Sequence, residues 1–210
     1  MTRLPITAIG LLLVLGACGQ REVPPSARTA PNPAPATQSE IEAAPVAASF
    51  ARVLEFQGVT FSVTSPNESV SNIVVVSTQG LESDNSAWRQ EVDGIVTGAE
   101  AADLDADGSP ELYVYVGSRA DDAMGSVVAY VANHRKSLSM ANMQPLSDTP
   151  DAAAGYRGHD EFAVLEGVLG RRFPIHDAAG KPTGRIRQLQ YVLAPGEAGW
   201  LLRVDKMLEF

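Results

Sequence analysis

Short runs of alternating apolar and polar residues fill the chain from Phe50 to its end. The first run, "RVLEFQGVTFSV" (residues 52–63), places large apolar side chains at every second position on both sides of a Gln-Gly pair. A period of two residues is that of a half-buried β-strand, and a Gln-Gly pair suits a tight turn. The segment is therefore predicted to form a β-hairpin.

Further strands are predicted from short apolar runs bounded by Gly, Asn, Asp or Ser, namely "SNIVVVS", "GIVTGAEAADL", "PELYVYVGS" and "GSVVAYVAN". A second hairpin is expected about Gly167 and a third about "PGEAG" (residues 195–199). Helical turns are expected only near residues 83–88 and 152–154. About ten short strands without a long helical period predict an all-β fold, an antiparallel β-sandwich or flattened barrel of about eight to ten strands.

Residues 1–17, "MTRLPITAIGLLLVLGA", have the pattern of a bacterial secretion signal: one arginine, an apolar run and small residues at the end. The run is too short to cross a bilayer as a mature helix. Its last residues and Cys18 match the lipobox of bacterial lipoproteins, in which this cysteine is acylated. An ordinary cleaved signal followed by a chance cysteine is the alternative. Cys18 is the single cysteine of the sequence, so no internal disulfide can form.

Residues 18–49 consist mainly of Pro, Ala, Ser, Thr and Gln, as in "PPSARTAPNPAPATQSE". Such a composition lacks the large apolar side chains that offset the entropy cost of ordering. We expect a disordered tether between the acylated Cys18 and a β domain at residues 50–210. Gly19 follows the cysteine where retention in the inner membrane favours Asp, so the expected location is the outer membrane, facing the periplasm.

The formal charge is −9, and removal of Arg3 with the signal peptide takes it to about −10. Such a negative chain is disfavoured as a nucleic-acid binder. Its field favours encounters with cationic proteins, cationic peptides or divalent metal ions.

The segment "DLDADGSPEL" (residues 103–112) places three aspartates at alternate positions before a glycine, as in the first half of a calcium-binding loop. Val114 stands where an EF-hand would place its closing glutamate, whereas Glu111 stands where strand-associated calcium loops place an Asp. Two interpretations stay open: a structural Ca²⁺ site, or a turn whose aspartates accept backbone N–H groups. The candidate ligands are Asp103, Asp105, Asp107 and Glu111.

The sequence offers little for catalysis. His159 and Asp160 in "GHDEF" are adjacent, and neighbouring side chains on a strand point to opposite faces, so they cannot easily act on one substrate. The three histidines lack the close spacing of a zinc site, and no nucleophile elbow, phosphate-binding loop or dinucleotide motif is present. The chain is predicted not to be an enzyme.

Several segments of the domain resemble the periplasmic inhibitors of invertebrate-type lysozyme, above all "GHDEFAV", "RRFP" and "PGEAGW". "EVDGIVTGAEAADL", "DLDADGSPELYVYVGS" and "GSVVAYVANHRKSLS" extend the likeness over most of residues 50–206. This resemblance implies an antiparallel β-sandwich, often dimeric, that binds a glycosidase and performs no chemistry itself.

In that family, a Ser-Gly-x-Tyr motif between two strands enters the lysozyme cleft. The corresponding segment here is "GSRADDAMGS" (residues 117–126), in which Asp121 and Met124 occupy the family's Ser and Tyr positions. An aspartate repels catalytic carboxylates unless one is protonated, but it can pair with arginines in a basic cleft. By this resemblance, the inhibitor-loop residues are Ser118, Asp121, Asp122, Met124, Gly125, Ser126 and Tyr130.

Together these features predict a lipid-anchored lipoprotein of the cell envelope that binds and inhibits a lysozyme (muramidase) through this loop. The alternative is a structural or calcium-stabilised envelope lipoprotein of the same fold that has lost inhibition. A solvated loop tip without a partner is the simplest interpretation of residues 118–126, and pairing of two chains is an option that the resemblance raises.

Overall fold

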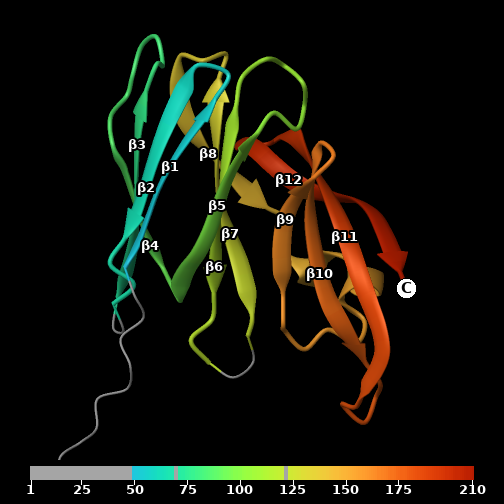
Figure 1. Cartoon of the computed structure of the whole chain (residues 1–210). Coiled ribbons are helices and arrows are strands. Elements are labelled where there is room, and N and C mark those ends of the chain that lie inside the picture. Colours follow the sequence, from blue (N-terminus) through green and yellow to red (C-terminus); the bar gives the residue numbers. More distant parts are fainter. Residues whose placement is uncertain (1–48, 69–70, 121–122) are drawn as a thin grey trace, which may run out of the picture. The chain divides into compact units, whose positions relative to one another are not determined.

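The computed structural model describes residues 49–68, 71–120 and 123–210. Within them it contains twelve strands, a 3₁₀ turn η1 (Leu146–Asp148) and one short helix α1 (Pro150–Ala153). The strands form a four-stranded and an eight-stranded sheet (Figure 1), which confirms the predicted all-β class. None of the helices in this part of the chain has the length and apolar character needed to cross a bilayer. The predicted signal peptide, Cys18 and nearly all of the tether lie outside the described residues.

The four-stranded sheet contains, in spatial order, β1 (Phe50–Phe56), β2 (Val59–Ser65), β3 (Asn72–Gln79) and β4 (Trp88–Val92), all antiparallel. The predicted first hairpin is confirmed as β1 and β2. Gln57 (φ 47°) and Gly58 (φ 74°) both have positive φ, as a two-residue hairpin turn of type I′ requires. On β2, alternation buries Val59, Phe61 and Val63 completely.

The eight-stranded sheet contains β5 (Ile95–Ala102), β6 (Glu111–Gly117), β7 (Gly125–Asn133), β8 (Ser137–Met143), β12 (Gly199–Glu209), β11 (Pro182–Gly196), β10 (Val168–His176) and β9 (Glu161–Leu165), in this spatial order. The hairpins predicted about Gly167 and "PGEAG" are confirmed as β9–β10 and β11–β12. The sheet is not purely antiparallel, because β12 pairs with β8 in parallel over Trp200–Leu202. That pairing joins two segments separated by a long stretch of sequence.

Two strands, β4 and β8, were absent from the sequence-based prediction. β4, "WRQEV", is mostly polar and lies at the edge of its sheet, and β8, "SLSMANM", has no β-branched residue. A helical turn is found at α1 as predicted, but the turn expected at residues 83–88 is not helical. There the Asn85 side chain bonds both the N–H and the C=O of Leu81 and so fixes the loop before β4.

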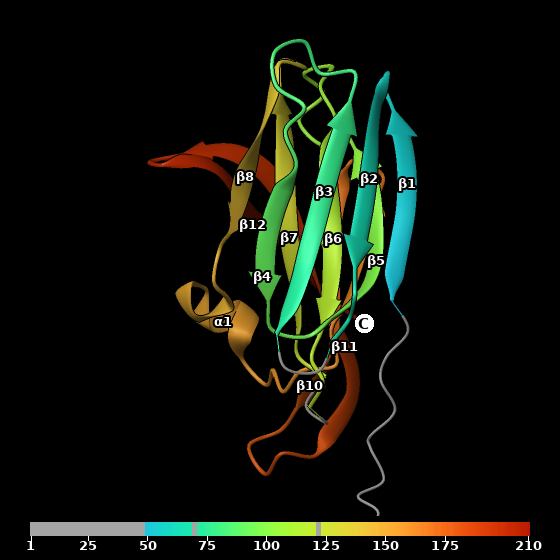
Figure 2. The same cartoon turned by 90° about the vertical axis from the view of Figure 1, so that its left-hand side faces the viewer.

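Strand β6 is buried on both faces. Leu112 and Val114 pack with β2 and β3 in one core cluster, whereas Tyr113 and Tyr115 pack with β10–β12 in another. Strands β5–β8 therefore form a middle layer between the four-stranded sheet and strands β9–β12 (Figures 1 and 2). The sequence of a strand that is covered on both sides is a continuous apolar run, as "LYVYV" in β6 is.

The eight-stranded sheet curls until its two edge strands, β5 and β9, approach each other. Glu100 on β5 accepts a hydrogen bond from the Val164 N–H of β9 at 2.8 Å, and the Tyr115 hydroxyl donates to the same carboxylate. Burial, together with the bond to Glu100, holds the pKa of Tyr115 far above its usual range, so this hydroxyl stays protonated. Side-chain hydrogen bonds thus help to make the sheet nearly barrel-like.

Truncating a buried side chain of β6 is expected to destabilise the whole domain. Leu112→Ala removes a fully buried side chain and should cost about 2–5 kcal/mol in the free energy of unfolding, measured by urea titration. Val53→Ala on β1, where the side chain is 69% exposed, is the matched control and should cost less than about 1 kcal/mol. Equal costs for the two variants would contradict the layered arrangement.

Candidate protein-binding rim and acidic cluster

The loop between β6 and β7, which the sequence singled out, has a fixed base. Gly117 pairs with Gly125, and the Ser118 N–H donates to the Met124 carbonyl at 2.8 Å. The Ala120 N–H donates to the Ser118 hydroxyl oxygen at 3.0 Å. The predicted contact residues Asp121 and Asp122 lie outside the described residues. We call residues 118–126 the rim.

A second segment of the chain supports the rim from one side. The N–H groups of His159 and Asp160 donate to the Ala123 carbonyl at 2.9 and 3.3 Å. In return, the Gly125 N–H donates to the Asp160 carboxylate at 2.8 Å. Residues 118–120 and 123–126 of the rim are therefore held both by their own strands and by the residues that precede β9.

Asp160 is the centre of a buried polar network. Its side chain has no exposed surface and pairs with the Arg171 guanidinium at 2.7 Å, whose side chain is only 9% exposed. The Tyr156 hydroxyl donates to the same carboxylate at 2.5 Å, and the guanidinium lies 4.9 Å from the centre of the Tyr156 ring. Burial, and next the bond to Asp160, raises the pKa of Tyr156 to about 12. Both partners of the ion pair thus have several polar or aromatic contacts.

The Asp160–Arg171 pair was not predicted from the sequence. The sequence did indicate that Arg171 is buried, because it alternates with Leu169 and Phe173 and so shares their face of β10. Asp160, just before β9, also accepts a hydrogen bond from the backbone N–H of Gly125. His159 is exposed and has a positive φ of 61°.

Tyr130 does not belong to the rim, which corrects the set of contact residues that the resemblance implied. It is 0% exposed and packs edge-to-face against Trp88 of β4, with ring centres 5.8 Å apart. On β7, Ser126 and Tyr130 share one face, but the four-stranded sheet covers that face at Tyr130, whereas Ser126 is exposed. Tyr130 is therefore a core residue.

At the rim itself, Met124 is 48% exposed. With Tyr156, Arg157 and His176 it borders an open depression of about 620 Å³. The accessible surface here is thus the rim together with the wall of this depression. It combines an apolar side chain with aromatic and basic ones and with the carboxylate of Asp177.

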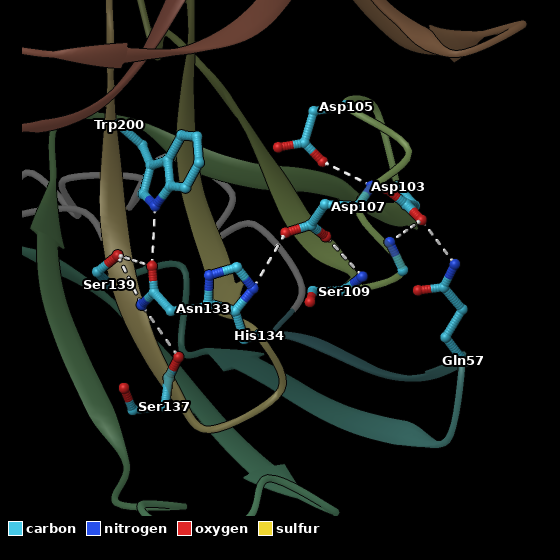
Figure 3. A network of polar contacts seen from close by, with 11 residues as sticks. Gln57, Asp103, Asp105, Asp107, Ser109, Asn133, His134, Ser137, Ser139 and Trp200 are labelled. Atoms are coloured by element: carbon cyan, nitrogen blue, oxygen red, sulfur yellow. Dashed lines mark hydrogen bonds and ion pairs between the residues drawn. The ribbon is translucent and has the colours of Figure 1, made fainter.

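The second candidate site lies at the opposite end of β6, in the connection from β5. The Asp103 carboxylate accepts hydrogen bonds from the N–H groups of Asp107 and Gly108 at 3.1 and 3.0 Å and from the Gln57 side-chain amide at 2.8 Å (Figure 3). The Ser109 N–H donates to Asp107 at 2.7 Å. The predicted turn with aspartates bound to backbone N–H groups is therefore present.

The structure also brings together the four candidate metal ligands that the sequence grouped. Asp103, Asp105, Asp107 and Glu111 each offer a carboxylate oxygen, and these oxygens all lie within 4.8 Å of one another. We call these residues the acidic cluster. Burial, and to a smaller extent the neighbouring aspartates, raises the pKa of Glu111 to about 8. Oxygen ligands in this arrangement can bind a metal ion.

His134, from the turn between β7 and β8, places its Nδ1 3.8 Å from the Asp107 carboxylate (Figure 3). Among the described residues, this is the one basic side chain within ion-pair distance of the acidic cluster. The imidazole is 81% exposed, so solvent screens the pair. The cluster therefore has little compensating positive charge from the described protein.

These observations define an all-β protein with a supported rim at one end of β6 and an oxygen-rich acidic cluster at the other. Comparison of the chain with family models, with curated proteins and with solved structures found no match.

Breaking the buried ion pair is expected to destabilise the domain. Asp160→Asn leaves Arg171 buried without its counter-charge and should cost about 3–5 kcal/mol in urea unfolding. The control is Asp177→Asn, because Asp177 also accepts backbone N–H groups but is exposed, so its cost should stay below about 1 kcal/mol. A loss for Asp160→Asn as small as that of the control would show that the pair does not hold this region.

Proposed function

We propose that this chain is a lipid-anchored lipoprotein of the cell envelope that binds a lysozyme-type muramidase through the rim and blocks its cleft. One observation carries the proposal: both ends of the rim, residues 118–120 and 123–126, are bonded, with contacts across the strands and to Asp160, which Arg171 holds in place. A preorganised loop loses little conformational entropy on binding, so more of its contact energy becomes affinity. The anchor at Cys18 and the outer-membrane location rest on the sequence.

The target's chemistry follows from the charges of the chain. Lysozymes use two carboxylates in a cleft, so Asp121 and Asp122 would be repelled by them. We propose instead that these aspartates pair with basic side chains at the border of the cleft, and that exposed Met124 contacts an apolar part of it. The net charge of −9 would speed the approach of a cationic enzyme. The chain is proposed to act by occupying the cleft, without chemistry of its own.

A second candidate function is favoured by different observations. The family's Ser and Tyr positions are replaced in the rim, whereas the acidic cluster is complete. On this view the chain is a structural envelope lipoprotein, stabilised by a divalent cation such as Ca²⁺, that no longer inhibits lysozyme. The two candidates differ in whether the rim has a partner.

The first candidate predicts measurable binding to lysozyme. The full chain in detergent, titrated against lysozymes of several types, should bind at least one of them and slow its lysis of a cell-wall suspension. Replacing residues 120–124 by glycine and serine should raise the Kd at least about tenfold, because the contact side chains are lost while Asp160 and Arg119, which donates to the Glu68 and Gly94 carbonyls, remain.

The matched control replaces Glu197 and Ala198, in the exposed turn between β11 and β12, by serine. This control should bind as tightly as the unaltered chain. Absence of binding and of inhibition for every lysozyme type would exclude the first candidate. Equal weakening by the control would show that the rim is not the contact surface.

A further inference from the structure

The strongest additional feature is the environment of Glu111 within the acidic cluster. Glu111 is the first residue of β6 and is only 1% exposed. One of its oxygens, Oε2, accepts the Leu104 N–H at 2.7 Å and lies 3.4 Å from the Tyr113 hydroxyl oxygen. The other, Oε1, is buried and has no hydrogen-bond partner among the residues that the structure describes. A buried polar atom left in this way is costly and needs a physical explanation.

A cation supplies that explanation. Glu111 presents an oxygen to the same small space as the three aspartates, within 4.8 Å of each. Four ionised carboxylates so close together repel one another, and this repulsion is relieved either by protonation of Glu111 or by positive charge between them. A bound cation would offset this repulsion and give the buried carboxylate a partner. The orphaned oxygen is independent of the turn geometry, which the backbone hydrogen bonds already explain.

We propose that Asp103, Asp105, Asp107 and Glu111 form a structural Ca²⁺ site. All four offer hard oxygen ligands, which suit calcium and magnesium better than zinc. Calcium takes six to eight oxygen ligands, often carboxylates, whereas magnesium usually keeps several waters and only one or two carboxylates. A cluster of four carboxylates therefore favours calcium.

The site would connect both sheets. Asp103 accepts a bond from Gln57 in the turn of the β1–β2 hairpin, which belongs to the four-stranded sheet, and Asp107 lies close to His134 in the turn between β7 and β8. A cation that fixes the aspartates therefore also fixes the ends of two neighbouring turns (Figure 3). We infer that calcium stabilises this end of the domain. The inference deepens the second candidate function, which includes a stabilising divalent cation, by naming the ion and its ligands. It holds whether or not the rim binds a protein.

The test is a calcium titration of the full chain in detergent, after removal of metal with a chelator. Calorimetry should show one binding site with a Kd of roughly 10⁻⁵ to 10⁻³ M. At a calcium concentration one hundred times the Kd, the melting temperature should rise by about 5–10 °C. Hydrogen exchange of residues 103–111 should slow in the presence of calcium.

Two variants and a control assign the site. Asp105→Asn, at an exposed position, and Glu111→Gln, which keeps an acceptor for the Leu104 N–H, should each weaken calcium binding at least about tenfold. Asp84→Asn removes an exposed aspartate that caps a different turn and should bind calcium like the unaltered chain.

No heat and no shift in melting temperature at 10 mM calcium, about ten times the weakest Kd expected, would overturn the proposal. An equal shift with magnesium, or an equal loss of affinity in Asp84→Asn, would overturn it as well. The lysozyme assay has a separate readout, so failure of the calcium site and failure of the rim are distinguishable.

Discussion

The fold depends on the burial of β6 on both faces. Leu112 and Val114 hold the four-stranded sheet, while Tyr113 and Tyr115 hold strands β9–β12, so one segment of seven residues connects three layers. The apolar surface removed from water on its two sides is the main stabilising contribution expected for a domain without a disulfide. The two candidate sites lie at opposite ends of β6. The ends of this strand are about 20 Å apart, because each step along a strand covers about 3.4 Å.

The buried carboxylates near the two ends of β6 have opposite effects on the stability of the fold. At the rim, Asp160 has Arg171, Tyr156 and a backbone N–H as partners, so the group is satisfied and fixes one position of the loop. Such an ion pair adds little net stability compared with apolar residues, and geometric definition of the rim is the role proposed for it. At the other end, one oxygen of Glu111 has no hydrogen-bond partner within residues 49–68, 71–120 and 123–210, which opposes folding unless a ligand is supplied. The buried carboxylate of Asp160 thus has its partners among the described residues, whereas that of Glu111 has a partner for only one of its two oxygens there.

Local patterns predicted the local structure well. Alternation and turn residues gave the hairpins at Gln57–Gly58 and about Gly167, and the spacing of the aspartates gave the acidic cluster. These features depend on residues close together in the sequence, where the period of side-chain direction is informative.

Long-range pairing was not predictable in the same way. The parallel contact of β8 with β12 depends on the curvature of the whole sheet, and β4 is stabilised by its neighbour β3 more than by its own polar residues. The ion pair of Asp160 and Arg171 and the burial of Tyr130 likewise depend on which layer covers each face. The sequence showed which side chains share a face, but not what lies opposite that face.

Native-state hydrogen exchange, resolved by residue, tests the central role of β6 most directly. If three layers depend on this strand, its amides should exchange at the slow rate set by global unfolding. The central amides of β2 and β10 should then exchange at the same rate as those of β6 or faster. Faster exchange in β6 than in β2 or β10 would show that an outer layer persists without it, which would contradict the account.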